Sequence, residues 1–271
     1  MADRGLGPLR AYALLAWMWT RAAAQYPASL LLLTCTQFAV TGLDFVAIGL
    51  LFAHTPRLAG FSLPELAFLY GSSCVSFGIA YLLLINLDNV GVHIRTGTLD
   101  AMLIRPVSPL AQLATEGFTP RRVGRLLQAA VVLAWAVPAL EVRWTPGRVL
   151  LVPVMIVSGA VIYGALWVLG AAFQVVVADT REVVNAFTYG GNFLTQYPLA
   201  IYGRELVHAV TWVVPLAFVN WQPALYLLDR PDPLGLPTVV RFASPAAALL
   251  LALVAAAAWR AALRHYRSTG S

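Results

Sequence analysis

The sequence predicts an all-α, polytopic membrane protein in which residues 1–271 form a single transmembrane domain. Of the 271 residues, 60% are apolar and only 11% are charged, which leaves too little polar surface for soluble domains of this total length. Several apolar runs are about twenty residues long, the length at which an α-helix crosses the hydrocarbon core of a bilayer. Composition and run length together therefore predict a bundle of membrane-spanning helices.

The first apolar segments predict a surface helix followed by a span. Residues 9–25 place Arg10 and Arg21 on nearly the same helix face and contain tryptophans suited to the membrane interface, so we expect this helix to lie along the membrane surface. Residues 28–52 are long enough to cross the membrane. They contain one acid, Asp44, and an unpaired carboxylate in lipid is costly. Asp44 is therefore either hydrogen-bonded to a neighbouring helix or part of a transport pathway.

Three further spans follow from their sequence and flanking signals. Residues 66–85 come after Ser62-Leu63-Pro64-Glu65, in which the serine can cap a helix, the proline fits its first turn and the glutamate complements its dipole. Residues 123–140 come after a second cap-then-proline signal, Thr119-Pro120. Residues 149–178 form the longest apolar run and contain glycines that permit close helix packing.

The region after residue 179 is harder to assign. Residues 183–200 have the length of a helix but carry amides, hydroxyls and glycines, so a helix here must face protein or a wet cavity. Residues 206–228 are apolar but interrupted by two prolines and an asparagine, which suits a re-entrant hairpin better than a crossing. Residues 242–263 are an uninterrupted final span.

The distribution of arginine predicts a cytosolic amino terminus. With six crossings, the inside holds twice as many arginines as the outside, as the positive-inside rule requires. The bias does not fix the number of spans, because treating residues 183–228 as no crossing gives the same ratio and moves the carboxyl terminus outside. The inside positions are 4, 10, 21, 95, 105, 121, 122, 125, 181, 260, 264 and 267, and the outside positions are 57, 143, 148, 204, 230 and 241.

Several classes of chemistry are excluded by what the sequence lacks. There is no lysine among the 18 basic residues, so the chain cannot carry a standard P-loop. The four histidines never occur at HExxH spacing, and Cys35 and Cys74 have no partner at metal-ligand spacing, so we expect no metal site. The arginines are scattered between apolar runs, which argues against nucleic-acid binding. The chain itself is thus predicted not to be an enzyme.

Residues 86–122 are the one long polar interruption, and their local signals agree with one another. Gly97 can end the preceding helix, Thr98 can cap a new one, and Asp100 lies in its first turn, where the helix dipole favours an acid. A second short helix starts at Ser108-Pro109. Two short amphipathic helices of this kind either dock a cytosolic partner or lie on lipid headgroups. The apolar side of the first helix consists of Leu99, Met102 and Leu103, and Arg105 with Pro106 ends it.

Three motifs occur in a characteristic order along the chain. The stretch SLPE (62–65) precedes the second span, the run Gly97-x-Leu99-Asp100-x-x-Leu103-x-Arg105-Pro106 follows it, and VPLAFVNWQPA (214–224) precedes the last span. This arrangement resembles the permeases of the ABC type-2 exporter family. It is most similar to a branch of uncharacterised bacterial ABC transport-system permeases that have the G-x-L-D-x-x-L-x-R-P signature in a cytosolic loop.

The resemblance implies six spans, an amino-terminal elbow helix, a coupling helix between spans two and three, and re-entrant helices before span six. It also implies two permease subunits, identical or related, in the bacterial inner membrane, with both termini cytosolic. Two separately encoded ATPase subunits would carry ATP and magnesium, so this chain needs no cofactor of its own. The residues that couple it to the ATPase would be Gly97, Leu99, Asp100, Met102, Leu103, Arg105 and Pro106.

The leading hypothesis is therefore the permease subunit of an ATP-driven exporter. One alternative is a self-contained, proton-coupled secondary transporter that uses Asp44 as its relay, and another is a non-transporting membrane anchor that recruits a partner. A drug, a lipid, a peptide antibiotic or a glycan precursor would each suit the moderately polar pathway. We expect Asp44, Asn185, Asn192 and Gln196 to line it.

Overall fold

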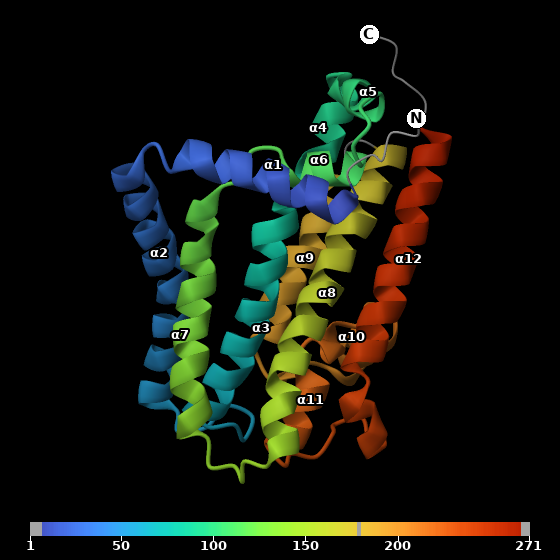
Figure 1. The fold of residues 1–271 in the computed structure, drawn as a ribbon. Helices are drawn as coiled ribbons and strands as arrows, with labels where there is room; N and C mark the ends of the chain where they lie inside the picture. The colour runs from blue at the N-terminus through green and yellow to red at the C-terminus, as the bar shows by residue number, and fades with distance from the viewer. Residues whose placement is uncertain (1–6, 178–179, 267–271) are drawn as a thin grey trace.

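The computed structural model describes residues 7–177 and 180–266, and within these ranges it contains helices and no β-strand. Five helices are long and apolar enough to cross a membrane: α2 (Pro27–His54), α3 (Leu63–Leu84) with its continuation to Arg95, α7 with the turn before it, α8 (Pro146–Val176) and α12 (Ser244–His265). They stand side by side in one bundle, with α2 and α7 at one side and α12 at the other (Figure 1). The all-α polytopic fold predicted from the sequence is confirmed.

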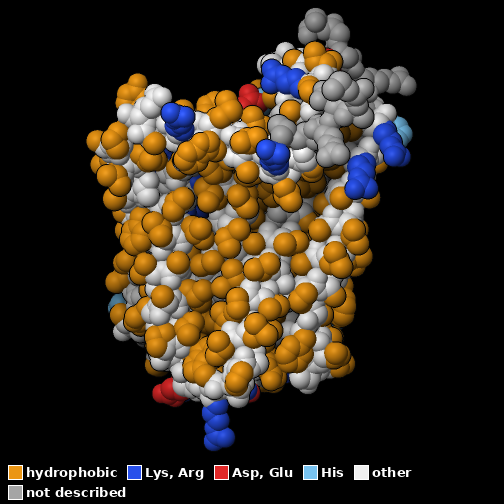
Figure 2. All heavy atoms as spheres, in the orientation of Figure 1, with side chains coloured by type: hydrophobic (Ala, Val, Ile, Leu, Met, Phe, Trp, Pro, Cys, Tyr) orange, Lys and Arg blue, Asp and Glu red, His pale blue; other side chains and the backbone are white. Residues whose placement is uncertain are grey.

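The surface of the bundle has the polarity that a membrane protein needs. Apolar side chains cover the length of the helices in a continuous band, and basic and acidic side chains gather at the two ends (Figure 2). Many of the exposed large apolar residues lie on α2, the least buried of the five helices. Because a contiguous apolar band of this size is not stable in water, lipid or another protein must cover it.

Helix α1 (Pro8–Ala23) runs across one end of the bundle (Figure 1). Pro27, at the first position of α2, separates the two helices. The Tyr12 hydroxyl of α1 donates a hydrogen bond of 2.9 Å to the carbonyl oxygen of Leu83 near the end of α3. Burial raises the pKa of Tyr12 to about 12, so this hydroxyl stays a donor at neutral pH and holds α1 on the bundle.

A capping box starts α3 at the opposite end. The Ser62 backbone N–H donates to Glu65 Oε2 at 2.7 Å, so the glutamate satisfies one of the orphan amides of the first turn. Arg230 donates to both oxygens of the same carboxylate, with Nε at 3.0 Å and Nη2 at 2.8 Å from Oε1 and Nη2 at 2.9 Å from Oε2. The loop before the last span is thereby fixed to the start of α3.

The second span is the longest continuous element of the fold. Helix α3, the 3₁₀ turn η1 (Ile85–Asn89) and α4 (Val90–Arg95) form one rod of 33 residues. At about 1.5 Å per residue the rod is roughly 50 Å long, and the hydrocarbon core is about 30 Å thick. The rod therefore extends well beyond the lipid at the end of the bundle where α1 lies (Figure 1).

The segment between α8 and α12 differs from a simple sixth span. Helix α9 (Arg181–Thr195) has only 15 residues, about 22 Å of helix, which is shorter than the hydrocarbon core. The chain nevertheless passes from the end where α8 stops to the opposite end where α12 starts (Figure 1). Two short helices, α10 (Arg204–Trp212) and α11 (Trp221–Leu227), lie in its second half. A count of six spans stays a prediction.

The remaining helices are short, apart from α7, and connect these parts. They are α5 (Thr98–Leu103), α6 (Pro109–Thr115), η2 (Pro120–Arg122), α7 (Val123–Ala139), η3 (Leu199–Ile201), η4 (Leu216–Phe218) and η5 (Thr238–Phe242).

Candidate functional site

The break between α4 and α5 turns the chain at the far end of the rod. Gly97 has φ +69°, in the left-handed region that residues with a Cβ rarely adopt. The Thr98 hydroxyl lies 2.9 Å from His93 Nδ1 and donates to the His93 carbonyl oxygen at 3.3 Å. Thr98 therefore fastens α5 back onto α4 and is the first residue of α5, whereas the sequence predicted that it would cap that helix.

The residues expected on the apolar side of α5 divide into a buried and an exposed group. Leu99 and Met102 are buried in the core, with 0% and 8% of their surface exposed. Leu103 is 36% exposed, and the next residue, Ile104, is 85% exposed. We call Leu103–Pro106 the tip, because all four of these residues are exposed. Leu99 and Met102 anchor α5, whereas the tip is available to a partner.

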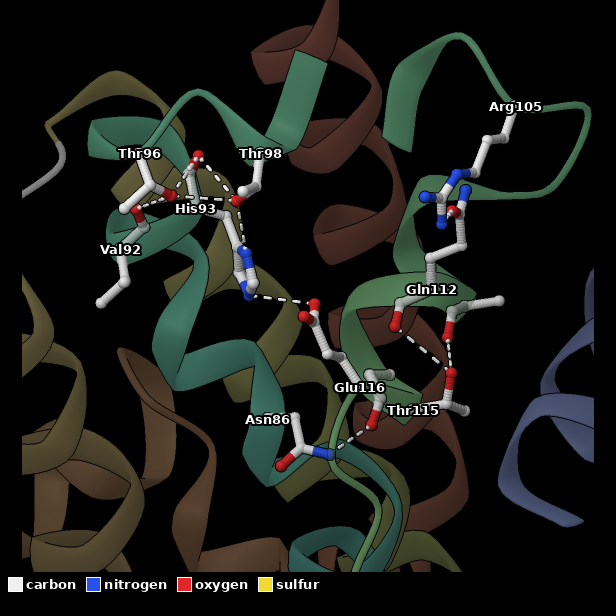
Figure 3. A network of polar contacts seen from close by, with 11 residues as sticks. Asn86, Val92, His93, Thr96, Thr98, Arg105, Gln112, Thr115 and Glu116 are labelled. Carbon is white, nitrogen blue, oxygen red and sulfur yellow. Dashed lines mark hydrogen bonds and ion pairs between the residues drawn. The ribbon is translucent and has the colours of Figure 1, made fainter. Parts of the chain in front are cut away.

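Gln112 of α6 holds the chain on both sides of the tip. Its Nε2 donates to the carbonyl oxygens of Met102 and Val107, each at 3.0 Å. Its Oε1 accepts a hydrogen bond of 3.4 Å from Nη1 of Arg105, which points back toward α6 (Figure 3). The tip is thus a loop of fixed shape, and the Arg105 guanidinium is used within it.

Two polar contacts join α6 to the rod below the tip. Asn86 Nδ2 donates to the Ala114 carbonyl oxygen at 2.9 Å, and its Oδ1 accepts from Arg122 Nη2 at 2.9 Å. His93 Nε2 lies 3.2 Å from Glu116 Oε2 (Figure 3). Displacement of the tip must therefore move α6 and the rod with it.

Helix α8 holds the rod from its other side. Gln174 Oε1 accepts the Gly91 backbone N–H at 2.9 Å, and its Nε2 donates to the Leu87 carbonyl oxygen at 3.3 Å. Trp167 Nε1 donates to Asp88 Oδ1 at 3.0 Å. A force applied at the tip is thereby passed to α3 and α8, which are both spans.

A buried polar cluster lies deeper in the bundle, between α3, α8 and α9. Ser73 Oγ and the Tyr163 hydroxyl lie 2.6 Å and 2.7 Å from Thr195 Oγ1. Asn220 Nδ2 donates to the Thr195 carbonyl oxygen at 2.9 Å. Ser73 also donates to Asn192 Oδ1 at 3.4 Å. These contacts explain why α9 tolerates so many polar residues, because its polar side faces protein.

The four predicted pathway residues are not gathered in one place. Asn192 is 3% and Gln196 is 6% exposed, so both face the interior. Asn185 is half-buried, and its Oδ1 is buried without a hydrogen-bond partner. Asp44 lies on the exposed side of α2. Asn192 and Gln196 thus face the interior, whereas Asp44 faces outward from α2.

Sequence reasoning missed Ile104 and the tyrosine and threonine of the polar cluster. Ile104 stands between two motif residues, and only the burial of its neighbours distinguishes it. Tyr163 and Thr195 are 32 positions apart, and no local sequence pattern predicts their contact. Among the described residues no group of three or more metal-ligating side chains comes together.

Comparison with known proteins identifies the family. The model of the ABC-2 family transporter proteins matches residues 38–270, which include every described helix except α1 and the first part of α2. No curated protein and no solved structure matches the chain. Since the match covers most of the chain, the protein belongs to the ABC-2 family and is a permease component of an ABC transporter.

Proposed function

We propose that the chain is the permease subunit of an ATP-driven exporter and that the tip, Leu103–Pro106, is its contact with a separately encoded ATPase. The observation that carries this proposal is the rod with its exposed end. An apolar side chain that is 85% exposed, Ile104, stands on a loop braced by hydrogen bonds at the end of a helix that runs back through the membrane. A rigid lever of this form is suited to passing on the motion of a partner.

The energetics of the tip favour a protein partner over water. Ile104 and Leu103 together offer an apolar contact, and Arg105 beside them supplies charge at its rim. Small apolar anchors surrounded by polar groups are typical of protein interfaces. ATP and magnesium would be bound by the ATPase, since this chain lacks the lysine that a P-loop requires.

The outer surface of α2 supports a second permease subunit as a further partner, identical or related. Asp44 is exposed in the middle of this apolar helix and makes no hydrogen bond or ion pair with the described residues. A carboxylate facing hydrocarbon is unfavourable, whereas one facing a protein-lined, hydrated pathway is tolerated. The pathway would then lie between two subunits, with Asp44 on its wall.

The orientation follows from the same assignment. If the tip contacts a cytosolic ATPase, then α1, the rod's end and the end of α12 lie on the cytosolic side of a bacterial inner membrane. The tip and the last turns of α12 carry several of the arginines that the positive-inside rule places in the cytosol.

Charge placed on the tip tests the coupling role. The variants Ile104→Glu and Leu103→Glu should abolish ATP-driven transport and reduce co-purification of the ATPase at least tenfold, because each buries a carboxylate in the interface. Val239→Glu, at the opposite end of the bundle and also exposed, is the matched control and should leave both unchanged. Intact transport in both tip variants would refute the assignment.

A proton-coupled carrier remains the second candidate, because Asp44 is a membrane-embedded acid without a described partner. Such a carrier should transport substrate into proteoliposomes with a pH gradient and no nucleotide. The variant Asp44→Asn should lose that transport. The proposed exporter shows no flux under those conditions. A membrane anchor would recruit the ATPase and support no flux under either condition.

A further inference from the structure

Four aromatic side chains form a cluster near the end of the bundle that carries the rod. Phe77 and Tyr81 of α3 meet Trp167 of α8 and Tyr189 of α9. The Phe77 ring centroid lies 5.2 Å from that of Trp167 and 5.6 Å from that of Tyr189, and the Tyr81 and Tyr189 centroids lie 6.3 Å apart. These are the tilted and edge-on contacts that aromatic rings prefer. We call these four residues the aromatic cluster.

Two arginines lie over the aromatic cluster. Arg125, one turn into α7, has its guanidinium carbon 4.6 Å from the Phe77 ring centroid and 5.5 Å from that of Tyr81. The Arg122 guanidinium carbon lies 5.8 Å from the Tyr81 centroid. Both distances to Tyr81 lie within the range of cation–π attraction, which orients a guanidinium but does not neutralise it.

Neither arginine has an anionic partner among the described residues. Arg125 makes no hydrogen bond or ion pair there, and Arg122 donates through Nη2 to Asn86 while its Nη1 is buried without a hydrogen-bond partner. The buried acid Asp88 accepts from Trp167 and feels the charge of Arg122, but it forms no ion pair with either arginine. Two adjacent guanidinium groups at the edge of a hydrocarbon core are costly without an anion. The arrangement therefore lacks one component.

The missing group can reach the cluster from outside. Arg122, Arg125, Tyr81 and Tyr189 are all half-exposed, so the cluster is open on one side. The Tyr81 hydroxyl makes no hydrogen bond with the described residues and adds a neutral donor, whereas the Tyr189 hydroxyl interacts with Asp88. On its inner side, Phe77 contacts Tyr163 edge-on at 5.3 Å, and Tyr163 belongs to the buried polar cluster.

We propose that Arg122, Arg125 and Tyr81 bind the phosphate group of an anionic amphiphile that enters from the membrane, with its apolar part along the aromatic cluster. Paired guanidinium groups match the geometry of phosphate oxygens, and a phenolic hydroxyl adds a donor. The position at the end of the spans suits a headgroup. One part of this inference rests on the proposed transport function, namely that the bound amphiphile belongs to the class of molecules that the exporter transports.

Binding to the purified full chain, without the ATPase, tests the site. Native mass spectrometry in neutral detergent would compare phosphatidic acid, phosphatidylcholine and inorganic pyrophosphate as probes. We expect phosphatidic acid to bind at least tenfold more tightly than phosphatidylcholine. Arg125→Gln should lower its affinity about tenfold, the effect of losing one charge-assisted contact. The matched control, Arg21→Gln in the exposed last turn of α1, should change nothing.

Further variants separate binding from folding and lipid from soluble anion. Arg125→Lys keeps the charge but not the planar fork, and Tyr81→Phe keeps the ring but not the donor, so each should weaken binding about threefold in a folded chain. Equal affinity for phosphatidic acid in the wild type and Arg125→Gln would overturn the site. Pyrophosphate binding without phosphatidic acid binding would overturn the amphiphile. Because ATPase recruitment depends on the tip, it should be normal in all of these variants, so failure here leaves the coupling proposal intact.

Discussion

Asn86 is the residue at which three parts of the tip end of the bundle meet. It is 5% exposed, and its amide joins the rod to the last turn of α6 and to Arg122 before α7. Removal of a buried amide that pairs with two groups lowers the free energy of unfolding by more than one hydrogen bond contributes, because both partners are left unpaired.

We predict that Asn86→Leu lowers the free energy of unfolding by about 1–3 kcal/mol, since it leaves the Ala114 carbonyl and the Arg122 guanidinium unpaired at nearly unchanged volume. The measurement is a denaturant titration in detergent micelles. Asn89→Leu is the control, because Asn89 is half-buried in the same turn and its side chain makes no hydrogen bond with the described residues. Equal effects at both positions would contradict the role given to Asn86.

Residue identity alone separates structural from exposed positions poorly. The motif between Gly97 and Pro106 predicts a turn, a short helix and its end, and the positive φ of Gly97 agrees. It does not reveal that Leu99 and Met102 face the core while Ile104 faces outward, because four large apolar residues within six positions can be divided between core and surface in several ways. Tertiary packing of α5 on α4 and α6 decides that division.

At the scale of elements, glycines set how closely α8 approaches its neighbours. A Cβ added at Gly170 would overlap the Val184 side chain of α9, and one added at Gly159 would lie 2.7 Å from Ser76 Oγ of α3. The sequence predicted close packing along this run, and the structure locates it on α3 and α9. Because α9 is short, its position depends strongly on such contacts.

We predict that Gly170→Ala destabilises the protein by about 1–3 kcal/mol through overpacking and that the double variant Gly170→Ala/Val184→Ala recovers most of the loss. A Cβ at Gly147, in the first turn of α8, meets nothing within 4 Å, so Gly147→Ala is the control and should change stability by less than about 1 kcal/mol. Thermal unfolding in detergent would measure all three. If the double variant were no more stable than Gly170→Ala, close packing of α8 on α9 would not be the reason for glycine at position 170.

Elements were predictable from the sequence where long apolar runs were bounded by capping residues or prolines, as for α2, α3, α8 and α12. Prediction was weakest for α9 to α11, because their polar residues are satisfied by contacts with α3 and α8 that are far apart in the sequence. Asn220, for example, donates to the carbonyl oxygens of Leu69 and Thr195. A hydropathy profile depends on neighbouring residues only, so it cannot predict a hydrogen bond between residues 151 positions apart.

For the whole molecule, the distribution of charge is the most informative feature. Arg122 and Arg125 were counted in the sequence only as positive-inside residues, and the aromatic rings beneath them come from α3, α8 and α9. The candidate anion site therefore required the fold. Asp44, by contrast, was singled out by the sequence, and its exposure on α2 is intelligible only if this surface meets another protein or water.

The tip, the rod and the two spans that hold it form one continuous set of contacts from the exposed end into the bundle. In this account the permease supplies the lever and the pathway, and the ATPase supplies the energy. The permease and the ATPase would touch at the few exposed residues of the tip, so their contact can be located by experiment.

Site-directed cross-linking in native membranes locates it most directly. In a chain with Cys35→Ala and Cys74→Ala, the variant Ile104→Cys should cross-link to a second polypeptide through a short bismaleimide. Mass spectrometry of the product should identify a P-loop in the sequence of that polypeptide. Val239→Cys, at a position that is also exposed but at the other end of the bundle, should give no such product. Cross-linking of the P-loop polypeptide at 239 and not at 104 would contradict the account.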